Sequence, residues 1–260
     1  MFKQLFLILI AFLLFSACAT SPTGRSQLIF MPDTQVNQMG LQAFDTLKKD
    51  KKISYNAQYN QSTTCIANAM TQIVGGNWEV VVFDDSSPNA FALPGNKIGV
   101  YTGMLQLMDK QEQLAAVIGH EIGHVLAKHS NERASQEMAM SQGLNVLQAM
   151  TMPTSALGQL GFGLLGVGAE YGVLKPYGRT QESEADIMGV DLMAKAGFDP
   201  QYSISLWQKM EQATQGKQTV EFLSTHPSHA TRIQDLEKHM PQAMSLYQQA
   251  QASGKQPHCI

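Results

Sequence analysis

The sequence lacks a basic stripe. Its net charge is −3, and lysine and arginine do not gather along any one segment. A nucleic-acid partner needs clustered cations to neutralise its phosphates, so this composition excludes nucleic-acid binding as the main role. The 260 residues, 44% of them hydrophobic, suffice to bury one sizeable core. With no internal repeat or low-complexity tail, we expect one main domain.

Cysteine is also scarce, and the first of three cysteines follows a possible export signal. Lys3 precedes an unbroken apolar run, Leu5–Phe15, which is too short to anchor the chain across a bilayer. Ser16-Ala17-Cys18 comes next and resembles a bacterial lipobox, with Phe15 in place of the usual leucine. The pattern predicts cleavage before a lipidated Cys18.

Lipidation of Cys18 would tether the chain to a membrane. We expect residues 1–17 to be a lipoprotein signal peptide and residues 18–32 to hold the lipidated cysteine and a tether. Ala19, rather than aspartate, is typical of sorting to the outer membrane of a Gram-negative host, facing the periplasm. The alternative is an ordinary cleaved signal with a cysteine there by chance.

The other two cysteines, Cys65 and Cys259, are a candidate disulfide because an exported chain meets an oxidising compartment. Closing so long a loop stabilises the fold by about 4–5 kcal/mol in the chain-entropy model. Two unpaired thiols are the alternative. Cys259 is not a prenylation site, since that signal needs the cysteine fourth from the end.

The remaining pattern predicts an α+β fold that is mostly helical. The expected helices cover 33–50, 63–74, 109–129, 180–196, a segment opened by Asp199-Pro200, and a last segment from 226 to just before Pro241. The expected strands cover 78–83, 90–93 and 97–101. Pro94-Gly95-Asn96 predicts a hairpin turn, so a small antiparallel sheet should precede the helix at 109–129. An Asp109-x-x-Glu112 capping box should open that helix.

No charged side chain occurs between residues 138 and 169. Six glycines and a break at Pro153 disfavour a stable membrane-spanning helix in this stretch. We expect residues 138–175 to form two helices joined near Pro153, as an apolar lid or a membrane-facing flap. A true transmembrane helix is the alternative.

His120-Glu121-Ile122-Gly123-His124 carries the strongest chemical signal. Two histidines four residues apart share one helix face, so their rings can reach one metal ion at about 2.0–2.1 Å. Glu121 points to one side, where it can take a proton from metal-bound water without ligating the metal. A pair of hydrogen-bonded core histidines is the alternative.

A zinc site of this kind needs a third protein ligand. Glu182 and Asp186 lie four residues apart on one helix face, so one carboxylate can ligate the metal and the other can accept a histidine ring N–H. Glu184 falls on another face, as a solvated charge or a local hydrogen-bond partner. His129 should be a surface residue at its helix end, where a cation suits the helix dipole.

Several separated motifs, in order, resemble one family. His-Glu-x-x-His at 120–124, Glu-x-Glu-Ala-Asp at 182–186 and His-Pro-x-x-x-x-Arg at 226–232 are similar to the zinc metallopeptidases of the HtpX and CAAX prenyl protease type. Thr23-Gly24-Arg25 also looks like a family feature, and the soluble, lipid-anchored envelope members are the most similar. The resemblance implies a zincin-like (gluzincin) catalytic domain over residues 33–260.

The resemblance also implies a ligand set, carried over residue by residue. Zinc, one ion per chain, would be held by His120, His124 and Glu182, with Glu121 as the general base. Asp186 matches a carboxylate behind the ligands that takes part in catalysis by orienting a histidine.

His226 and Arg232 gain their roles from the resemblance alone. His226 matches a histidine near the metal that either stabilises the oxyanion or occupies the open coordination position. Arg232 matches an arginine that holds the ligating glutamate, and its planar donors suit a carboxylate.

The residues Asn89, Ala90 and Phe91 belong to another family-like motif, Asn-Ala-Phe-Ala-Leu-Pro-Gly. An edge strand beside a zinc site can pair with an extended substrate through main-chain hydrogen bonds, which ignore sequence. An ordinary strand of the sheet is the alternative.

These patterns predict a zinc-dependent endopeptidase, lipid-anchored in the bacterial envelope, that hydrolyses unfolded or misfolded envelope proteins in protein quality control. Its expected partners are such substrates, the membrane through the lipid on Cys18, and other envelope proteins. One alternative is a non-enzymatic or autoinhibited assembly factor that keeps the zinc fold, although a pure binder has no need of Glu121. Another is an integral membrane protease spanning the bilayer with residues 138–169.

Overall fold

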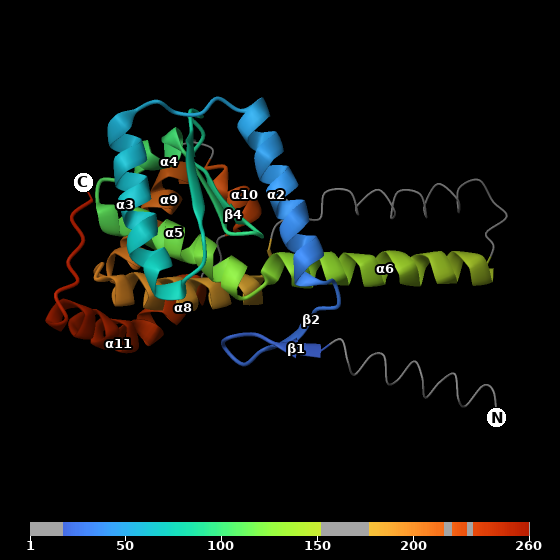
Figure 1. Cartoon of the computed structure of the whole chain (residues 1–260). Coiled ribbons are helices and arrows are strands. Elements are labelled where there is room, and N and C mark those ends of the chain that lie inside the picture. Colours follow the sequence, from blue (N-terminus) through green and yellow to red (C-terminus); the bar gives the residue numbers. More distant parts are fainter. Residues whose placement is uncertain (1–17, 152–176, 216–219, 228–230, 260) are drawn as a thin grey trace. The chain divides into compact units, whose positions relative to one another are not determined.

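The computed structural model describes residues 18–151, 177–215, 220–227 and 231–259 (Figure 1). These residues fall into two compact units. The smaller unit takes its residues from 18–36 and 128–151, and the larger takes the remainder. The predicted signal peptide at 1–17 and most of the predicted flap, at 152–175, lie outside the described residues.

The smaller unit contains a β-hairpin and the start of a long helix. Strands β1 (Cys18–Thr20) and β2 (Ser26–Leu28) pair antiparallel. Arg25 in the connecting turn donates two hydrogen bonds, of 2.6 and 2.7 Å, to Glu132 on helix α6 (His129–Thr151). The segment that was predicted to be a tether therefore includes a hairpin held by a buried carboxylate.

His129 is fully buried, so the prediction that it lies on the surface is wrong. The expected helix does not run on to residue 129, because Lys128 takes a left-handed conformation with φ 54°. That residue ends one helix and starts the next, which redirects every side chain after it.

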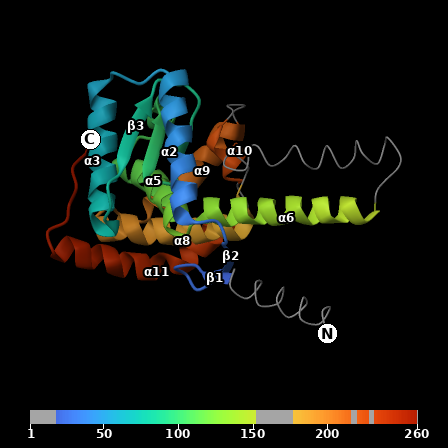
Figure 2. The same cartoon turned by 45° about the vertical axis from the view of Figure 1, so that its right-hand side comes forward.

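The larger unit is mostly helical, which confirms the predicted fold class. It contains the greater part of α2 (Asp33–Asp50), then α3 (Ala57–Val74), α4 (Thr102–Leu107), α5 (Gln111–Leu126), α8 (Arg179–Ala196), α9 (Tyr202–Gln215), α10 (Phe222–Thr225) and α11 (Thr231–Ala252). Helix α5 is buried along almost its whole length and packs against α3, α8, α9 and strand β4. Helix α8 in turn lies between α5 and α11 (Figure 2).

A three-stranded sheet precedes α5. Strands β4 (Ala90–Leu93) and β5 (Lys97–Tyr101) pair antiparallel across the predicted turn, whereas β3 (Glu79–Phe83) runs parallel to β5. The sheet is thus mixed, and it differs from the predicted antiparallel sheet in one strand. The reason is topological: β5 returns between β3 and β4, which leaves β4 at the edge of the sheet.

Two helix boundaries also differ from the sequence prediction. Helix α5 begins at Gln111 without a side-chain cap, and the expected capping box is replaced by a hydrogen bond from the Asp109 amide to Gln113 Oε1. Helix α11 continues through Pro241 to Ala252. Its buried residues recur at spacings of four and seven residues along one face, and packing of that face against α8 and α9 outweighs the loss of one backbone hydrogen bond at proline.

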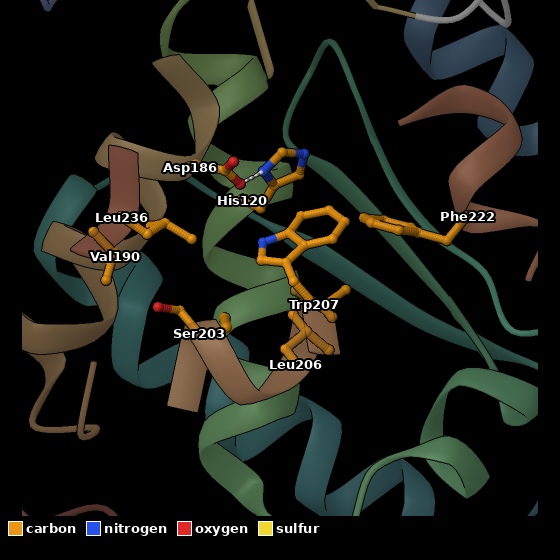
Figure 3. A pocket seen from close by; sticks show the side chains of 10 residues that line it. His120, Asp186, Val190, Ser203, Leu206, Trp207, Phe222 and Leu236 are labelled. Carbon is orange, nitrogen blue, oxygen red and sulfur yellow. Dashed lines mark hydrogen bonds and ion pairs between the residues drawn. The ribbon is translucent and has the colours of Figure 1, made fainter. Parts of the chain in front are cut away.

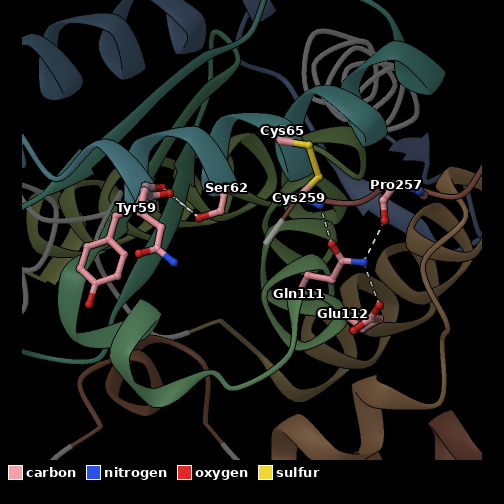
Figure 4. The surroundings of a disulfide bond; sticks show 8 residues. Tyr59, Ser62, Cys65, Gln111, Glu112, Pro257 and Cys259 are labelled. Carbon is pink, nitrogen blue, oxygen red and sulfur yellow. Dashed lines mark hydrogen bonds between the residues drawn. A yellow bond between two sulfur atoms is a disulfide. The ribbon is translucent and has the colours of Figure 1, made fainter.

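The structure pairs Cys65 on α3 with Cys259 in the C-terminal segment, with their Cα atoms 5.5 Å apart (Figure 4). Gln111, the first residue of α5, donates to the Pro257 carbonyl and accepts from the Cys259 amide, each at 2.8 Å. The disulfide and this side chain therefore fix the C-terminal segment on both α3 and α5.

Among the described helices, none has the length and apolar character needed to cross a membrane.

Candidate metal centre

The site is built where α5 and α8 approach each other very closely. A Cβ atom on Gly189 would lie 2.6 Å from the backbone nitrogen of His120, and one on Gly123 would lie 2.9 Å from the carbonyl oxygen of Ala185. Only glycine leaves room for this backbone contact. The approach brings the carboxylates of α8 within reach of the histidines on α5.

Four buried side chains converge at this point: His120, His124, Glu182 and His226. Their nearest nitrogen and oxygen atoms all lie within 4.8 Å of one another. Nε2 of His120 is 3.0 Å from Nε2 of His124 and 3.2 Å from Nδ1 of His226. Glu182 Oε1 lies 3.4 Å from His124 Nε2 and 3.1 Å from His226 Nδ1.

The charge of this cluster fits a divalent cation. Glu121, Glu182 and Asp186 are buried carboxylates, and Arg232 contacts the last two. With neutral histidines, as metal ligands must be, three carboxylates and one guanidinium carry a net charge of −2. Buried charges are tolerated only when they are paired or coordinate a metal. Four imidazole and carboxylate donors around one point are a ligand set that suits zinc.

Two carboxylate oxygens point to the same conclusion. Glu121 Oε1 and Glu182 Oε2 are buried without a hydrogen-bond partner among the described residues. Glu182 Oε2 does lie 2.8 Å from Arg232 Nη1, but this ion-pair contact lacks the direction of a hydrogen bond. Buried carboxylate oxygens without a hydrogen bond can still accept one, or can bind a metal ion.

Asp186 and Arg232 brace the cluster from behind. Asp186 Oδ1 lies 2.9 Å from Nδ1 of His120, so a proton on Nδ1 leaves Nε2 directed at the cluster. Arg232 donates from Nε and Nη2 to Asp186 at 2.6 and 2.7 Å. One guanidinium therefore contacts both acidic residues that the sequence singled out on α8.

Burial and pairing act against each other on the pKa values. Burial lowers the pKa of His124, which favours its neutral, donating form. Burial also works to lower the pKa of His120, but its hydrogen bonds with Asp186 and Glu182 outweigh this and raise it to about 9. Burial raises the pKa of Glu121 above the usual carboxylate value, which suits a group that must both take and return a proton.

Glu121 lies beside the donor cluster, against the edge strand. Its Oε2 accepts a hydrogen bond of 2.9 Å from the amide of Ala92, and its Oε1 is 3.3 Å from Nε2 of His226. The sequence named Asn89, Ala90 and Phe91 on this strand. Backbone groups alternate sides along a strand, and the Tyr101 amide bonds the Asn89 carbonyl, so the outward positions are Ala90 and Ala92.

Several residues at the site have no clear signal in the sequence. Tyr177 stacks on the ring of His124 with centroids 3.9 Å apart, and Phe222 stacks on His226 at 4.3 Å. Trp207 lies over Arg232. Aromatic residues without a motif cannot be told from ordinary core residues. Glu184, for which a solvated position was one expectation, is buried.

The family profile of Peptidase family M48 matches residues 56–240. The chain belongs to this family. Mitochondrial metalloendopeptidase OMA1 of Schizosaccharomyces pombe is 36% identical over 71% of this chain and 55% of its own length. Metalloprotease LoiP of Escherichia coli K12 is 30% identical over 82% of this chain and 84% of its own length. The Beta-barrel assembly-enhancing protease of Yersinia pestis is 30% identical over 56% of this chain and 31% of its own length.

This M48 chain spans about half the length of the OMA1 proteins it matches. The match covers all elements from α3 to α10 and the first part of α11, and so includes the helices α5 and α8. The predicted family is confirmed, and the cluster fits one metal ion of the kind that M48 metallopeptidases use.

Proposed function

We propose that the chain is a zinc-dependent endopeptidase in which His120, His124 and Glu182 hold one zinc ion and Glu121 is the general base. The observation that carries the proposal is the buried convergence of these donors on two tightly packed helices, with Glu121 directly beside them. Zinc bound there would supply Lewis acidity, which makes a nearby water more acidic and polarises a peptide carbonyl.

The two oxygens of Glu121 have different tasks in this proposal. Oε2 is held by the Ala92 amide, and Oε1 has no hydrogen bond, so Oε1 takes the proton of the attacking water. Burial raises the pKa of Glu121, which helps it to hold that proton and then pass it to the leaving amine.

His226 closes the site in the arrangement described. Its Nδ1 is 3.2 Å from His120 Nε2 and 3.1 Å from Glu182 Oε1, within the donor cluster itself. A substrate carbonyl would need that space, so we propose that His226 withdraws when a peptide binds and then donates to the developing negative charge.

We propose strand β4 as the partner of an extended substrate. Its outward backbone groups are those of Ala90 and the Ala92 carbonyl, because the Ala92 amide already donates to Glu121. Both residues are buried in this arrangement, so they would pair with a peptide main chain, whatever its sequence, only after the site has opened. Such binding needs an unfolded segment, since a folded substrate has its own backbone groups paired. Unfolded or misfolded proteins of the bacterial envelope are the proposed substrates, supported by the similarity to LoiP over most of both chains.

The decisive comparison is wild type against Glu121→Gln, with zinc content and cleavage of a chemically unfolded test protein measured on the same preparations. Glu121→Gln should keep about one zinc per chain and lose about 10²–10⁴-fold in cleavage rate, the usual contribution of a general base. A zinc chelator should stop the wild type. Glu237→Gln, at an exposed carboxylate on α11, is the matched control and should behave as wild type. Equal cleavage by Glu121→Gln would refute the catalytic role.

The position of His226 also supports a second function, an autoinhibited or non-enzymatic assembly factor of the envelope. That protein would contain zinc and bind unfolded chains without cutting them. Zinc at one per chain together with no cleavage by either wild type or His226→Ala would favour this second function.

Lipid anchoring through Cys18, and location at the periplasmic face of the outer membrane, are part of the same proposal. The support is the lipobox-like sequence before Cys18. Mass spectrometry of the mature N-terminus should find a lipidated cysteine, and Cys18→Ser should release the chain on alkaline extraction of membranes. Retention of Cys18→Ser would instead favour a span within residues 138–169.

A further inference from the structure

Trp207 on α9 lies flat against the guanidinium of Arg232. The central carbon of that group, Cζ, is 3.6 Å from the centre of the indole ring. Both side chains are buried, with 5% and 1% exposed. A cation this close to an aromatic face, away from water, makes one of the stronger cation–π contacts found in proteins.

The contact completes the fixation of Arg232. Hydrogen bonds to Asp186 and the ion pair with Glu182 hold the guanidinium within its own plane. These contacts act at the nitrogen atoms along the edge of the guanidinium, whereas the indole lies over its central carbon. The indole supplies a flat support for the plane, and tilting the guanidinium would weaken its contacts with both acids together.

The space beside Trp207 has room for at most about one water molecule. The cavity that Trp207 shares with His120, Asp186 and Leu236 measures only about 10 Å³, the lower limit for a single water (Figure 3). Figure 3 shows the indole between the His120 ring and Leu206, with Phe222 beyond it. Excluding water here strengthens the charge interactions of Arg232 with its two carboxylates.

We propose that Trp207 is a positioning residue for the metal centre: by stacking on Arg232 it fixes the directions of Glu182 and Asp186, and through them the metal affinity. This inference rests on the ligand set proposed above. Trp207 also meets the ring of His120 edge to face, with centroids 6.1 Å apart, so a direct route through His120 competes with the proposed route through Arg232. The competing explanation is that Trp207 is a core residue whose loss affects stability alone.

Zinc affinity separates the two explanations. Purified Trp207→Leu, Trp207→Phe and a control, Phe198→Leu, are titrated with zinc against a competing chelator. Phe198 is a buried aromatic residue of the same core without a described ring contact to the site. Trp207→Leu should bind zinc about 10-fold more weakly, as do losses of groups behind metal ligands. Trp207→Phe should stay within about 3-fold of wild type because it keeps an aromatic face.

Equal zinc affinity of Trp207→Leu and Phe198→Leu overturns the proposal. Thermal unfolding of the zinc-free proteins accompanies the titration, since both substitutions should lower stability. If Trp207→Leu does not fold, the comparison of Trp207→Phe with Trp207→Met decides, and equal affinity of those two has the same consequence.

A double-mutant cycle tests the route through Arg232. In an Arg232→Met background, adding Trp207→Leu should change zinc affinity by less than about 2-fold, since the group that transmits the effect is already gone. A full additional 10-fold loss there would show that Trp207 acts by another path and would overturn the inference.

A cobalt absorption spectrum tests the ligand geometry without cleavage, and steady-state kinetics test the effect on cleavage. With cobalt in place of zinc, the visible absorption band should shift in Trp207→Leu and stay unchanged in Phe198→Leu, because the band reports ligand directions. In the active enzyme, Trp207→Leu should lower kcat and leave KM unchanged. If Glu182→Gln binds zinc as wild type does, the ligand set fails and this inference with it. If zinc binds as expected but no variant cleaves, only the proposed enzymatic function fails.

Discussion

Gly189→Ala should damage the metal centre without touching any side chain in it. The new Cβ would lie 2.6 Å from the His120 nitrogen, 2.8 Å from the Gly119 carbonyl carbon and 2.9 Å from the His120 Cα, all of them backbone atoms. Backbone atoms of two packed helices cannot rotate away. To recover an ordinary contact the helices must part by about 0.8 Å.

The magnitude follows from two opposing effects. Replacing glycine with alanine inside a helix favours folding by about 1 kcal/mol. Overpacking at a backbone contact costs about 1–3 kcal/mol, so the net change should be destabilising by up to about 2 kcal/mol. A shift near 0.8 Å also exceeds the tolerance of about 0.2 Å on metal–ligand distances, since Glu182 lies on the displaced helix. Zinc affinity should therefore fall by about 10-fold or more.

Thermal unfolding of the zinc-free protein and chelator competition measure the two changes. Gly178→Ala, at the N-cap of the same helix, is the control, because its Cβ would meet only Gln181 Oε1, at 3.8 Å. It should leave both quantities near wild type. If Gly189→Ala unfolds at or above the wild-type temperature and binds zinc normally, the close approach of α5 and α8 does not determine the site.

Two further substitutions test other parts of the structure. His226→Ala should keep zinc at about one per chain and change the cleavage rate, because the proposed ligands His120, His124 and Glu182 are the three that a catalytic zinc site needs. Loss of zinc from the purified variant would mean that His226 is an obligatory ligand. Asp85→Asn tests an ion pair outside the site: partial burial acts to raise the pKa of Asp85, but hydrogen bonds from Lys51 and Ser87 outweigh it and lower the pKa to about 2. A depressed pKa stabilises the fold above the unfolded value near 3.8 and loses that effect as the pH falls towards 2. Asp85→Asn should therefore be less stable at neutral pH, by less than about 1 kcal/mol because the pair is partly solvated, and the difference should shrink as the pH falls through about 2. Denaturant unfolding at several pH values measures the difference, and a value as large at pH 2 as at neutral pH contradicts the assignment.

The parts of the site that the sequence predicts are those that depend on local geometry. Helical spacing alone places His120 and His124 on one face, and the same spacing pairs Glu182 with Asp186. The family resemblance then adds the later motif that contains Arg232. These predictions use residue spacing within one helix or the order of motifs along the chain. They therefore need no knowledge of how the helices pack.

What the sequence does not predict depends on contacts between elements. Strand β3 pairs in parallel with β5, not with β4, the strand that follows it in the chain. The alternation of residues within a strand does not indicate which strand will be its partner. The helix break occurs at Lys128, which takes a left-handed conformation although it is not a glycine, so the sequence carries no usual sign of the break. Trp207 and Tyr177 look like ordinary core aromatics until the positions of Arg232 and His124 are known.

The hydrogen bond from the Ala92 amide to Glu121, the proposed general base, comes from the backbone and does not depend on a side chain. Its support comes from the main chain, which every amino acid except proline supplies. Substitution of position 92 can therefore alter what lines the strand and still leave the carboxylate held. Under the proposed role of β4 in substrate binding, side chains along this strand can change during evolution while Glu121 keeps its position.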